Sequence, residues 1–264
     1  MKPAAPLVIG DTVTINSKEL GEMRRINIYG PPGYAEAPDK RFPVLYMPDG
    51  GMAEDFIHVA GLIQVSVSNA TMRPFILVGI ENTERRRDLT GPTENVEDGK
   101  IAPRVGGSEA FRKFVRTELK PEVKARYRTT EETAVVGESL AGLWVVETLL
   151  FEPDLFDSYL AFDPSLWWNK DNLLKVAPEQ LMKSAEMEKK LYIVASSDMG
   201  DLGQRFADIA RRVQDRNFIG TTKRCPKKNT RRSTIRRHCE VFVTSSNSGL
   251  RSSLMRRTVV PTVF

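Results

Sequence analysis

One serine stands in a setting that could make it a nucleophile. Ser139 lies in the stretch TAVVGESLAGLW, between a β-branched run and a segment that predicts a helix. Small residues on both sides of a serine are typical of a tight strand-to-helix turn, which holds the hydroxyl at the tip of the bend. The first amides of the following helix, Leu140 among them, would face developing negative charge. The stretch therefore predicts acyl transfer, with the Leu140 amide as an oxyanion donor.

The local motif is too loose to decide the matter alone. Its usual form has glycine two residues after the serine, whereas here Ala141 stands there and Gly142 follows. A match of this looseness arises by chance in roughly one chain in five of this length. A structural turn serine is the alternative interpretation, so the elements around Ser139 have to carry the argument.

Apolar runs alternate with amphipathic stretches along most of the chain. Six runs predict strands buried on both faces: residues 26–29, 44–47, 75–80, 133–136, 159–162 and 191–195. Four stretches predict helices: residues 52–67, 108–125, 140–151 and 202–215. Such alternation favours one α/β domain with a mostly parallel sheet covered by helices on both faces.

The charge is divided unevenly along the chain. Residues 217–264 hold 11 Lys or Arg and one acid, Glu240, so they carry +10. The other 28 basic and 33 acidic residues give residues 1–216 a charge of −5. This shift predicts a domain over residues 1–216 and an atypical basic segment over residues 217–264.

Composition excludes several other classes. Both cysteines, Cys225 and Cys239, lie in the basic segment, so the body carries neither a disulfide framework nor a cysteine-ligated metal site. No apolar run approaches the ~18 residues of a membrane span. No signal peptide is visible at the N-terminus, which predicts a cytoplasmic protein, although a leader already removed would leave no trace. The predicted chemistry needs no metal and no organic cofactor.

Five blocks of sequence resemble the esterase family of α/β hydrolases that includes enterochelin-type siderophore esterases and esterase D. In the family's order they are RRINIYGPPGY, VLYMPDGG, ILVGIENTERRRDLT, VVGESLAG and FDPSLWW, within residues 20–215. The resemblance implies an α/β-hydrolase fold and hydrolysis of a small or aromatic, siderophore-type ester. Five ordered blocks are far more specific than a single turn motif.

The resemblance also assigns the remaining site residues. The MPDGG turn would offer a second oxyanion amide, assigned to Gly51, although such turns also end ordinary strands. The catalytic acid should follow the strand at residues 191–195, where Asp198 is preferred over Asp201, which could instead cap the next helix. Arg85 and Arg87 in a long loop, with Trp167 and Trp168, would border the ester-binding cleft. A solvated role for the arginines and a core role for one tryptophan are the alternatives.

The general base is where the sequence departs from the family. Only two histidines exist, and the family's base follows the eighth strand. His58 lies within a predicted helix before the serine, and His238 lies among arginines with no strand pattern before it. Read in another frame, codons for residues 226–241 can encode a string similar to the family's histidine loop and last helix. The sequence thus suggests a frameshift near residue 217 that removed the last strand, the histidine and the last helix.

Two other functions compete with an active esterase. One is a catalytically inactive hydrolase-fold protein, and the other is a binder of nucleic acid or an acidic surface through residues 217–264. The basic segment has only scattered aromatic residues and no recognisable binding motif, so nucleic-acid binding is disfavoured. The expected partner is a small-molecule ester, and nothing in the sequence indicates an oligomeric state.

Overall fold

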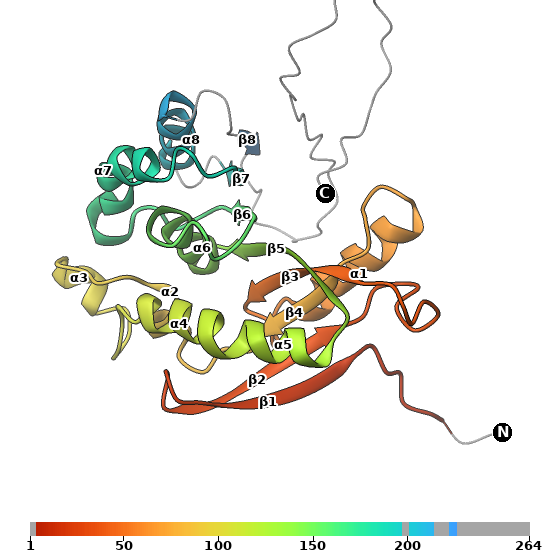
Figure 1. Cartoon of the computed structure of the whole chain (residues 1–264). Helices are drawn as coiled ribbons and strands as arrows, with labels where there is room; N and C mark the ends of the chain where they lie inside the picture. The colour runs from red at the N-terminus through yellow and green to blue at the C-terminus, as the bar shows by residue number, and fades with distance from the viewer. Residues whose placement is uncertain (1–3, 197–200, 214–221, 226–264) are drawn as a thin grey trace, which may run out of the picture.

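The strands form one eight-stranded sheet. A computed structural model of the chain describes residues 4–196, 201–213 and 222–225. Its strands are β1 (Asp11–Ser17), β2 (Glu22–Tyr29), β3 (Phe42–Pro48), β4 (Ile76–Ile80), β5 (Thr129–Glu138), β6 (Ser158–Phe162), β7 (Lys190–Ser196) and β8 (Thr222–Cys225). They lie in the order β1-β2-β4-β3-β5-β6-β7-β8 (Figure 1). Only the pairs β1/β2 and β2/β4 are antiparallel. The predicted α/β-hydrolase architecture is confirmed.

Helices cover both faces of this sheet. They are α1 (Phe56–Ser68), α2 (Arg85–Leu89), α3 (Val96–Gly99), α4 (Ser108–Phe114), the π-helical turn η1 (Val115–Leu119), α5 (Lys120–Arg126), α6 (Leu140–Phe151), α7 (Trp168–Lys183) and α8 (Leu202–Val213). On one face α1 buries Phe56, Ala60 and Ile63 against alternate residues of β3 and β4. On the other face α4, α6, α7 and α8 share a larger core. Strands covered on both sides explain the continuous apolar runs in the sequence.

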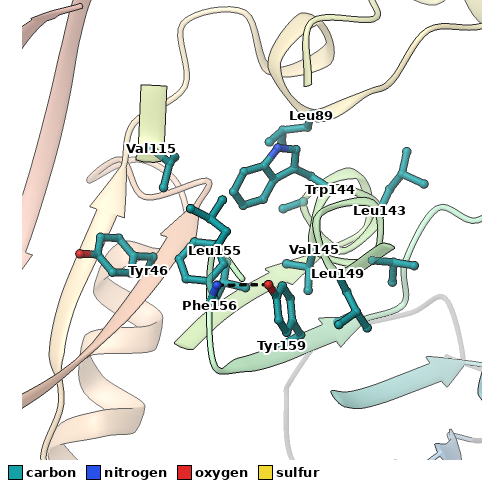
Figure 2. Close-up of a cluster of buried hydrophobic side chains, with 14 of the residues drawn as sticks. Tyr46, Leu89, Val115, Leu143, Trp144, Val145, Leu149, Leu155, Phe156 and Tyr159 are labelled. Atoms are coloured by element: carbon teal, nitrogen blue, oxygen red, sulfur yellow. Dashed lines mark hydrogen bonds between the residues drawn. The ribbon is translucent and has the colours of Figure 1, made fainter. Parts of the chain in front are cut away.

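Aromatic and aliphatic side chains around α6 fill the larger core. Trp144 is completely buried, and its ring meets the edges of Phe111 and Phe156 at centroid distances of 5.2 and 6.4 Å. Tyr159 is buried beside them and its hydroxyl accepts a hydrogen bond from the Phe156 amide (Figure 2). Because every residue from Leu140 to Leu150 is buried, α6 is fixed along its length. The start of α6 is therefore a rigid platform.

The fold also contains elements that the sequence patterns did not predict. β1 was missed because its residues alternate between polar and apolar at an exposed sheet edge. α7 was missed because it is polar, contains Pro178 and has three residues with left-handed backbone, Asn169 to Asp171, near its start. The prediction that the last strand is missing needs correction, since β8 pairs in parallel with β7 from Thr222 to Cys225. β8 lies within the segment predicted to be a separate basic tail.

Candidate active site

Ser139 stands at a sharp turn between β5 and α6. Its backbone has φ 57° and ψ −117°, a left-handed conformation that non-glycine residues rarely adopt. Such a residue costs on the order of 1–3 kcal/mol and persists only where its surroundings hold it. The Ser139 side chain is exposed although its neighbour Leu140 is buried. The fold thus keeps the Ser139 hydroxyl exposed to solvent, at the energetic cost of a strained backbone.

Close backbone approaches around Ser139 explain the small residues on either side. A methyl group on Gly137 would come within 2.5 Å of the backbone carbon and oxygen of Ala141. One on Gly142 would lie 3.0 Å from the carbonyl oxygen of Phe162. Ala141 itself is fully buried in the core, where its methyl group packs. The fold therefore accommodates alanine at position 141, where the usual motif has glycine. The close approach to the Phe162 carbonyl oxygen is made at Gly142 instead.

The loop after β6 forms hydrogen bonds to the turn at Ser139. The Ser139 amide donates to the Phe162 carbonyl at 3.0 Å, and the Ser165 amide donates to the Ser139 carbonyl at 3.0 Å. The two hydroxyl oxygens, Ser139 Oγ and Ser165 Oγ, are 3.3 Å apart. We call residues 137–142 and 162–166 together the elbow clamp. Sequence reasoning missed Ser165, whose only signal was its place in FDPSLWW.

Asp163 ties the elbow clamp to the next strand. Its backbone is left-handed, with φ 48°, and its amide donates to the Val194 carbonyl at 2.7 Å. Its carboxylate accepts the Ser196 amide at 2.8 Å. The predicted acid Asp198 lies just beyond β7, outside the described residues. Asp201 is exposed at the start of α8, and its carbonyl accepts the Arg205 amide there.

The two amides assigned to the oxyanion differ in availability. Leu140 is the first residue of α6, and among the described residues its amide has no hydrogen-bond partner. It therefore offers a free donor at a helix N-terminus. The Gly51 amide instead donates to a carboxylate oxygen of Glu54 at 2.6 Å. Gly51 can act as an oxyanion donor only if Glu54 moves away from it.

Glu54 belongs to a wider set of contacts that fixes the turn after β3. Its other carboxylate oxygen accepts the Asn82 side chain at 2.9 Å, and that side chain also donates to Asp49 at 2.6 Å. Arg85 makes a two-pronged pair with Asp49, at 2.6 and 2.7 Å. Much of the hydrogen-bonding capacity of Arg85 is thus directed to Asp49, although its side chain is 36% exposed. These contacts join the MPDGG turn to the loop after β4.

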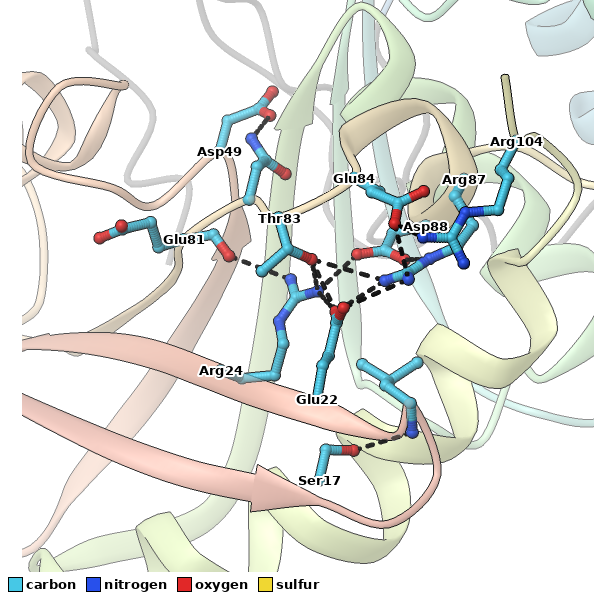
Figure 3. A network of polar contacts seen from close by, with 12 residues as sticks. Ser17, Glu22, Arg24, Asp49, Glu81, Thr83, Glu84, Arg87, Asp88 and Arg104 are labelled. Atoms are coloured by element: carbon cyan, nitrogen blue, oxygen red, sulfur yellow. Dashed lines mark hydrogen bonds and ion pairs between the residues drawn. The ribbon is translucent and has the colours of Figure 1, made fainter. Parts of the chain in front are cut away.

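Arg87, predicted to border the ester-binding cleft, makes its contacts in the structure with carboxylates of the fold. Its guanidinium donates to Glu22 at 2.7 Å and to Asp88 at 2.7 Å, and only 15% of its side chain is exposed. Asp88 in turn pairs at 2.6 Å with Arg24, and both side chains are buried (Figure 3). We call this set the arginine network; its members are Glu22, Arg24, Thr83, Glu84, Arg87 and Asp88. Arg87 is therefore held by carboxylates of the fold, and the sequence did not reveal its partner Glu22.

The arginine network also sets the ionisation of Glu22. Burial alone would raise its pKa, but hydrogen bonds from Arg87, Thr83 and Arg24 favour the carboxylate and lower the pKa to about 2. The network therefore holds Glu22 charged well into the acid range. Both arginines of the network are paired with its carboxylates, so neither is left as an unpaired cation for an anionic substrate.

The two tryptophans lie in different settings. Trp168 is 4% exposed and its indole N–H donates to the Gly91 carbonyl at 2.9 Å. It borders a cavity of about 290 Å³ whose other walls include Pro92, Phe151 and Leu173. Trp167 is 38% exposed, with its ring centroid 6.1 Å from that of Trp168. The cavity does not include the elbow clamp, so Trp168 is both a core residue and a wall of a neighbouring hollow.

Neither histidine is shown near Ser139. His58 is exposed on α1, the helix that covers the smaller core, and His238 lies outside the described residues. In the part of the chain that the structure describes, no group of three or more His, Cys, Asp or Glu side chains could hold a metal ion. None of the helices over those residues is long and apolar enough to cross a membrane.

Comparison with known proteins agrees with this geometry. Residues 17–255 match the family described as "Putative esterase". The chain belongs to that family. It is 32% identical over 197 residues to ferri-bacillibactin esterase BesA of Bacillus subtilis, which covers 68% of each chain. It is 35% identical over 102 residues to a siderophore enterobactin esterase of Emericella nidulans, about a third of each chain.

Solved structures share the fold over most of the chain. An IroE-like serine hydrolase from Shewanella oneidensis is 29% identical, with a TM-score of 0.74 over 83% of this chain and 74% of that one. The BES protein from Bacillus cereus has the same TM-score at 22% identity and shows the fold alone. The family match and these relatives show that the chain is a carboxylic-ester hydrolase, as the resemblance of its sequence blocks predicted.

Proposed function

We propose that this chain is a serine esterase that cleaves siderophore-type esters through an acyl-enzyme formed on Ser139. The observation that carries the proposal is the strained, exposed Ser139 at the start of the buried helix α6. In the first step Ser139 Oγ attacks the ester carbonyl and the alcohol leaves. In the second step water releases the acid.

The oxyanion of each step needs hydrogen-bond donors already in place. The Leu140 amide fits this role because it is free among the described residues and lies at a helix N-terminus. Gly51 remains the predicted second donor, once the carboxylate of Glu54 has moved from its amide. Asp198 remains the predicted acid that orients a base.

Two features support the substrate class. Names of several relatives specify siderophore esters, ferri-bacillibactin and enterobactin among them. The cavity beside Trp168 has apolar walls at Pro92, Phe151 and Leu173 beside polar lining residues such as Glu94 and Asn172, and Trp167 exposes its ring nearby. Such surfaces suit the aromatic acyl groups of a catecholate ester. The partner we propose is thus a small aromatic ester.

The proposed substrate is tested by product analysis. The chain is incubated with ferri-bacillibactin and with enterobactin, and linear products are followed by mass spectrometry beside the Ser139→Ala variant. Opening of the ester ring by the natural chain and not by the variant is expected. Equal product from both proteins would contradict the proposal, and cleavage of simple p-nitrophenyl esters alone would restrict it to small esters.

The presence or absence of the general base sets the rate of the proposed reaction. The family's base follows the last strand, whereas here β8 lies inside the basic segment and the histidine after it, His238, stands among arginines. We propose that a shifted reading frame over residues 217–264 removed the base, which leaves the oxyanion donors and binding to supply residual activity. Loss of a triad member costs several orders of magnitude in kcat.

The frameshift is tested by sequencing and by repair. Re-sequencing the coding region should reveal a change near residue 217, and a version with the other frame restored should gain about 10³-fold or more in kcat. An intact single frame in an independent clone, with equal activity in both versions, would contradict it. If the chain is instead a catalytically inactive hydrolase-fold protein, the repaired chain and its Ser139→Ala variant should have equal esterase activity.

A further inference from the structure

The loop after β6 places a second hydroxyl against the nucleophile. Ser165 is 2% exposed, and its Oγ lies 3.3 Å from Ser139 Oγ. Its amide is already used by the Ser139 carbonyl at 3.0 Å. Among the described residues, Ser139 Oγ is the only hydrogen-bond partner of the Ser165 hydroxyl. The two side chains therefore form a pair in which one member is buried and the other is open to solvent.

Either hydroxyl could be the donor at this distance, and we assign that role to Ser165 from the difference in burial. A serine hydroxyl has one proton to donate, and leaving a buried donor without an acceptor is costly. Ser165 has no solvent to receive its proton, so it donates to Ser139. Ser139 is exposed and keeps its own proton free for solvent or a base. This arrangement is the one that nucleophilic attack requires.

We propose that Ser165 is a catalytic hydrogen-bond donor that stabilises negative charge on Ser139 Oγ as its proton departs. A hydrogen bond to a charged oxygen is stronger than one to a neutral hydroxyl, so the contact strengthens as charge develops. Its catalytic importance rests on the proposed function of Ser139. The hydrogen bond itself does not depend on that function.

The loop is held firmly enough for this role. The Ser165 carbonyl accepts the Trp168 amide at 3.1 Å, and the Leu166 amide donates to the Pro164 carbonyl at 2.7 Å. Asp163 fastens the same loop to the end of β7 through the Val194 carbonyl and the Ser196 amide. A donor fixed before the reaction needs no reorganisation during it. Ser165 is thus already aimed at the oxygen that becomes charged.

A thiol in place of the nucleophile tests this contact without any turnover. In the full-length Ser139→Cys variant, alkylation by iodoacetamide is measured against pH, with Ser165 intact or changed to Ala. Mass spectrometry of tryptic peptide 129–170 isolates position 139, because both native cysteines lie outside it. With Ser165 intact the thiol should have a pKa about one unit lower, which is roughly a tenfold difference in thiolate at a pH below both values.

The matched control is Ser184, another buried hydroxyl. It lies at the end of α7 and donates to the carbonyls of Leu181 and Gln180 at 3.3 and 3.4 Å. Ser184→Ala in the same Ser139→Cys background should leave the thiol pKa unchanged. If Ser165→Ala fails to fold, the pair Ser165→Thr and Ser165→Val compares a hydroxyl with a methyl group of equal size. A thiol pKa that does not respond to loss of the hydroxyl in folded variants overturns the proposal.

Ester hydrolysis separates this inference from the proposed function. In the natural Ser139 background, Ser165→Ala should lower kcat roughly tenfold to a hundredfold with KM within about twofold, and Ser165→Thr should retain most of the activity. An unchanged kcat, with activity that still requires Ser139, overturns the role of Ser165 alone. Activity that survives Ser139→Ala overturns the proposed function, whereas the thiol measurement still decides the hydrogen bond.

Discussion

The elbow clamp and the arginine network hold neighbouring loops by opposite means. The elbow clamp uses backbone hydrogen bonds and close approaches at Gly137 and Gly142, with few charged groups. The arginine network uses ion pairs between side chains more than 60 residues apart, such as Arg24 with Asp88. Backbone contacts place one hydroxyl accurately and leave it exposed. The side chains of the ion pairs instead direct their hydrogen-bonding groups to one another, so few of these groups are available to bind a substrate.

The largest expected loss follows from removing the buried acid of the arginine network. Asp88→Ala leaves the fully buried Arg24 without its closest counter-charge, which should lower the free energy of unfolding by about 3–5 kcal/mol. Urea denaturation followed by circular dichroism measures it. Glu131→Ala removes an exposed ion pair with Lys124 and should leave the free energy of unfolding almost unchanged. Equal losses for the two variants would remove the distinction between buried and exposed pairs.

A methyl group in the elbow clamp should damage chemistry more than stability. Gly137→Ala places its methyl group against the Ala141 backbone and must shift Ser139, so kcat for a p-nitrophenyl ester should fall by about a hundredfold. Gly61→Ala is the matched control, because a methyl group there meets no atom within 4 Å. It should leave kcat unchanged and stabilise α1 by up to about 1 kcal/mol. If both variants keep full activity, the close approach does not control the nucleophile.

The Arg87→Ala variant distinguishes a structural role of this arginine from a substrate-binding role. Arg87→Ala removes donors to Glu22 and Asp88 and should lower the free energy of unfolding by about 1–3 kcal/mol, with KM almost unchanged. Denaturation and steady-state kinetics on the same preparations measure both. A severalfold rise in KM with stability intact would support the substrate-binding role predicted from the sequence.

The smallest expected effect is the acid response of the arginine network. Because the Glu22 pKa falls from 4.5 to about 2 on folding, its stabilisation is fully present above pH 4.5. It is lost as the pH falls from 4.5 towards 2, where the folded protein also takes up the proton. Glu22→Gln should be less stable at pH 7, and its stability should fall less steeply over that window. Parallel curves for the two proteins would mean that Glu22 is not held as a carboxylate.

Sequence patterns predicted the parts of this fold that depend on local burial. Residues 140–151 were predicted as a helix and form α6 over the same range, because a helix buried on all sides is apolar throughout. The turn at Ser139 was predicted from small residues that pack within a few positions of one another. By contrast, β1 and α7 are largely polar, and only tertiary pairing identifies them.

The same limit explains which contacts near the site were not predicted. Arg87 resembled a cleft residue because its partner Glu22 lies far away in sequence on β2. Ser165 gave no signal beyond its place in FDPSLWW, since its contact with Ser139 arises from the pairing of β5 with β6. The Gly51 case is different, because Glu54 follows three residues later and such a carboxylate commonly reaches back to an amide at the start of a helical turn. That contact could have been predicted.

Covalent labelling by a fluorophosphonate, applied to the version with the other reading frame restored, tests most directly whether Ser139 is the nucleophile. We expect one phosphonate adduct, located by mass spectrometry at Ser139 within tryptic peptide 129–170, and no adduct on that peptide in the Ser139→Ala variant. Ser158 and Ser165 lie in the same peptide and serve as internal controls. Labelling at either of them, or an unlabelled Ser139 in a folded chain, would contradict the claim that this fold presents Ser139 as its nucleophile.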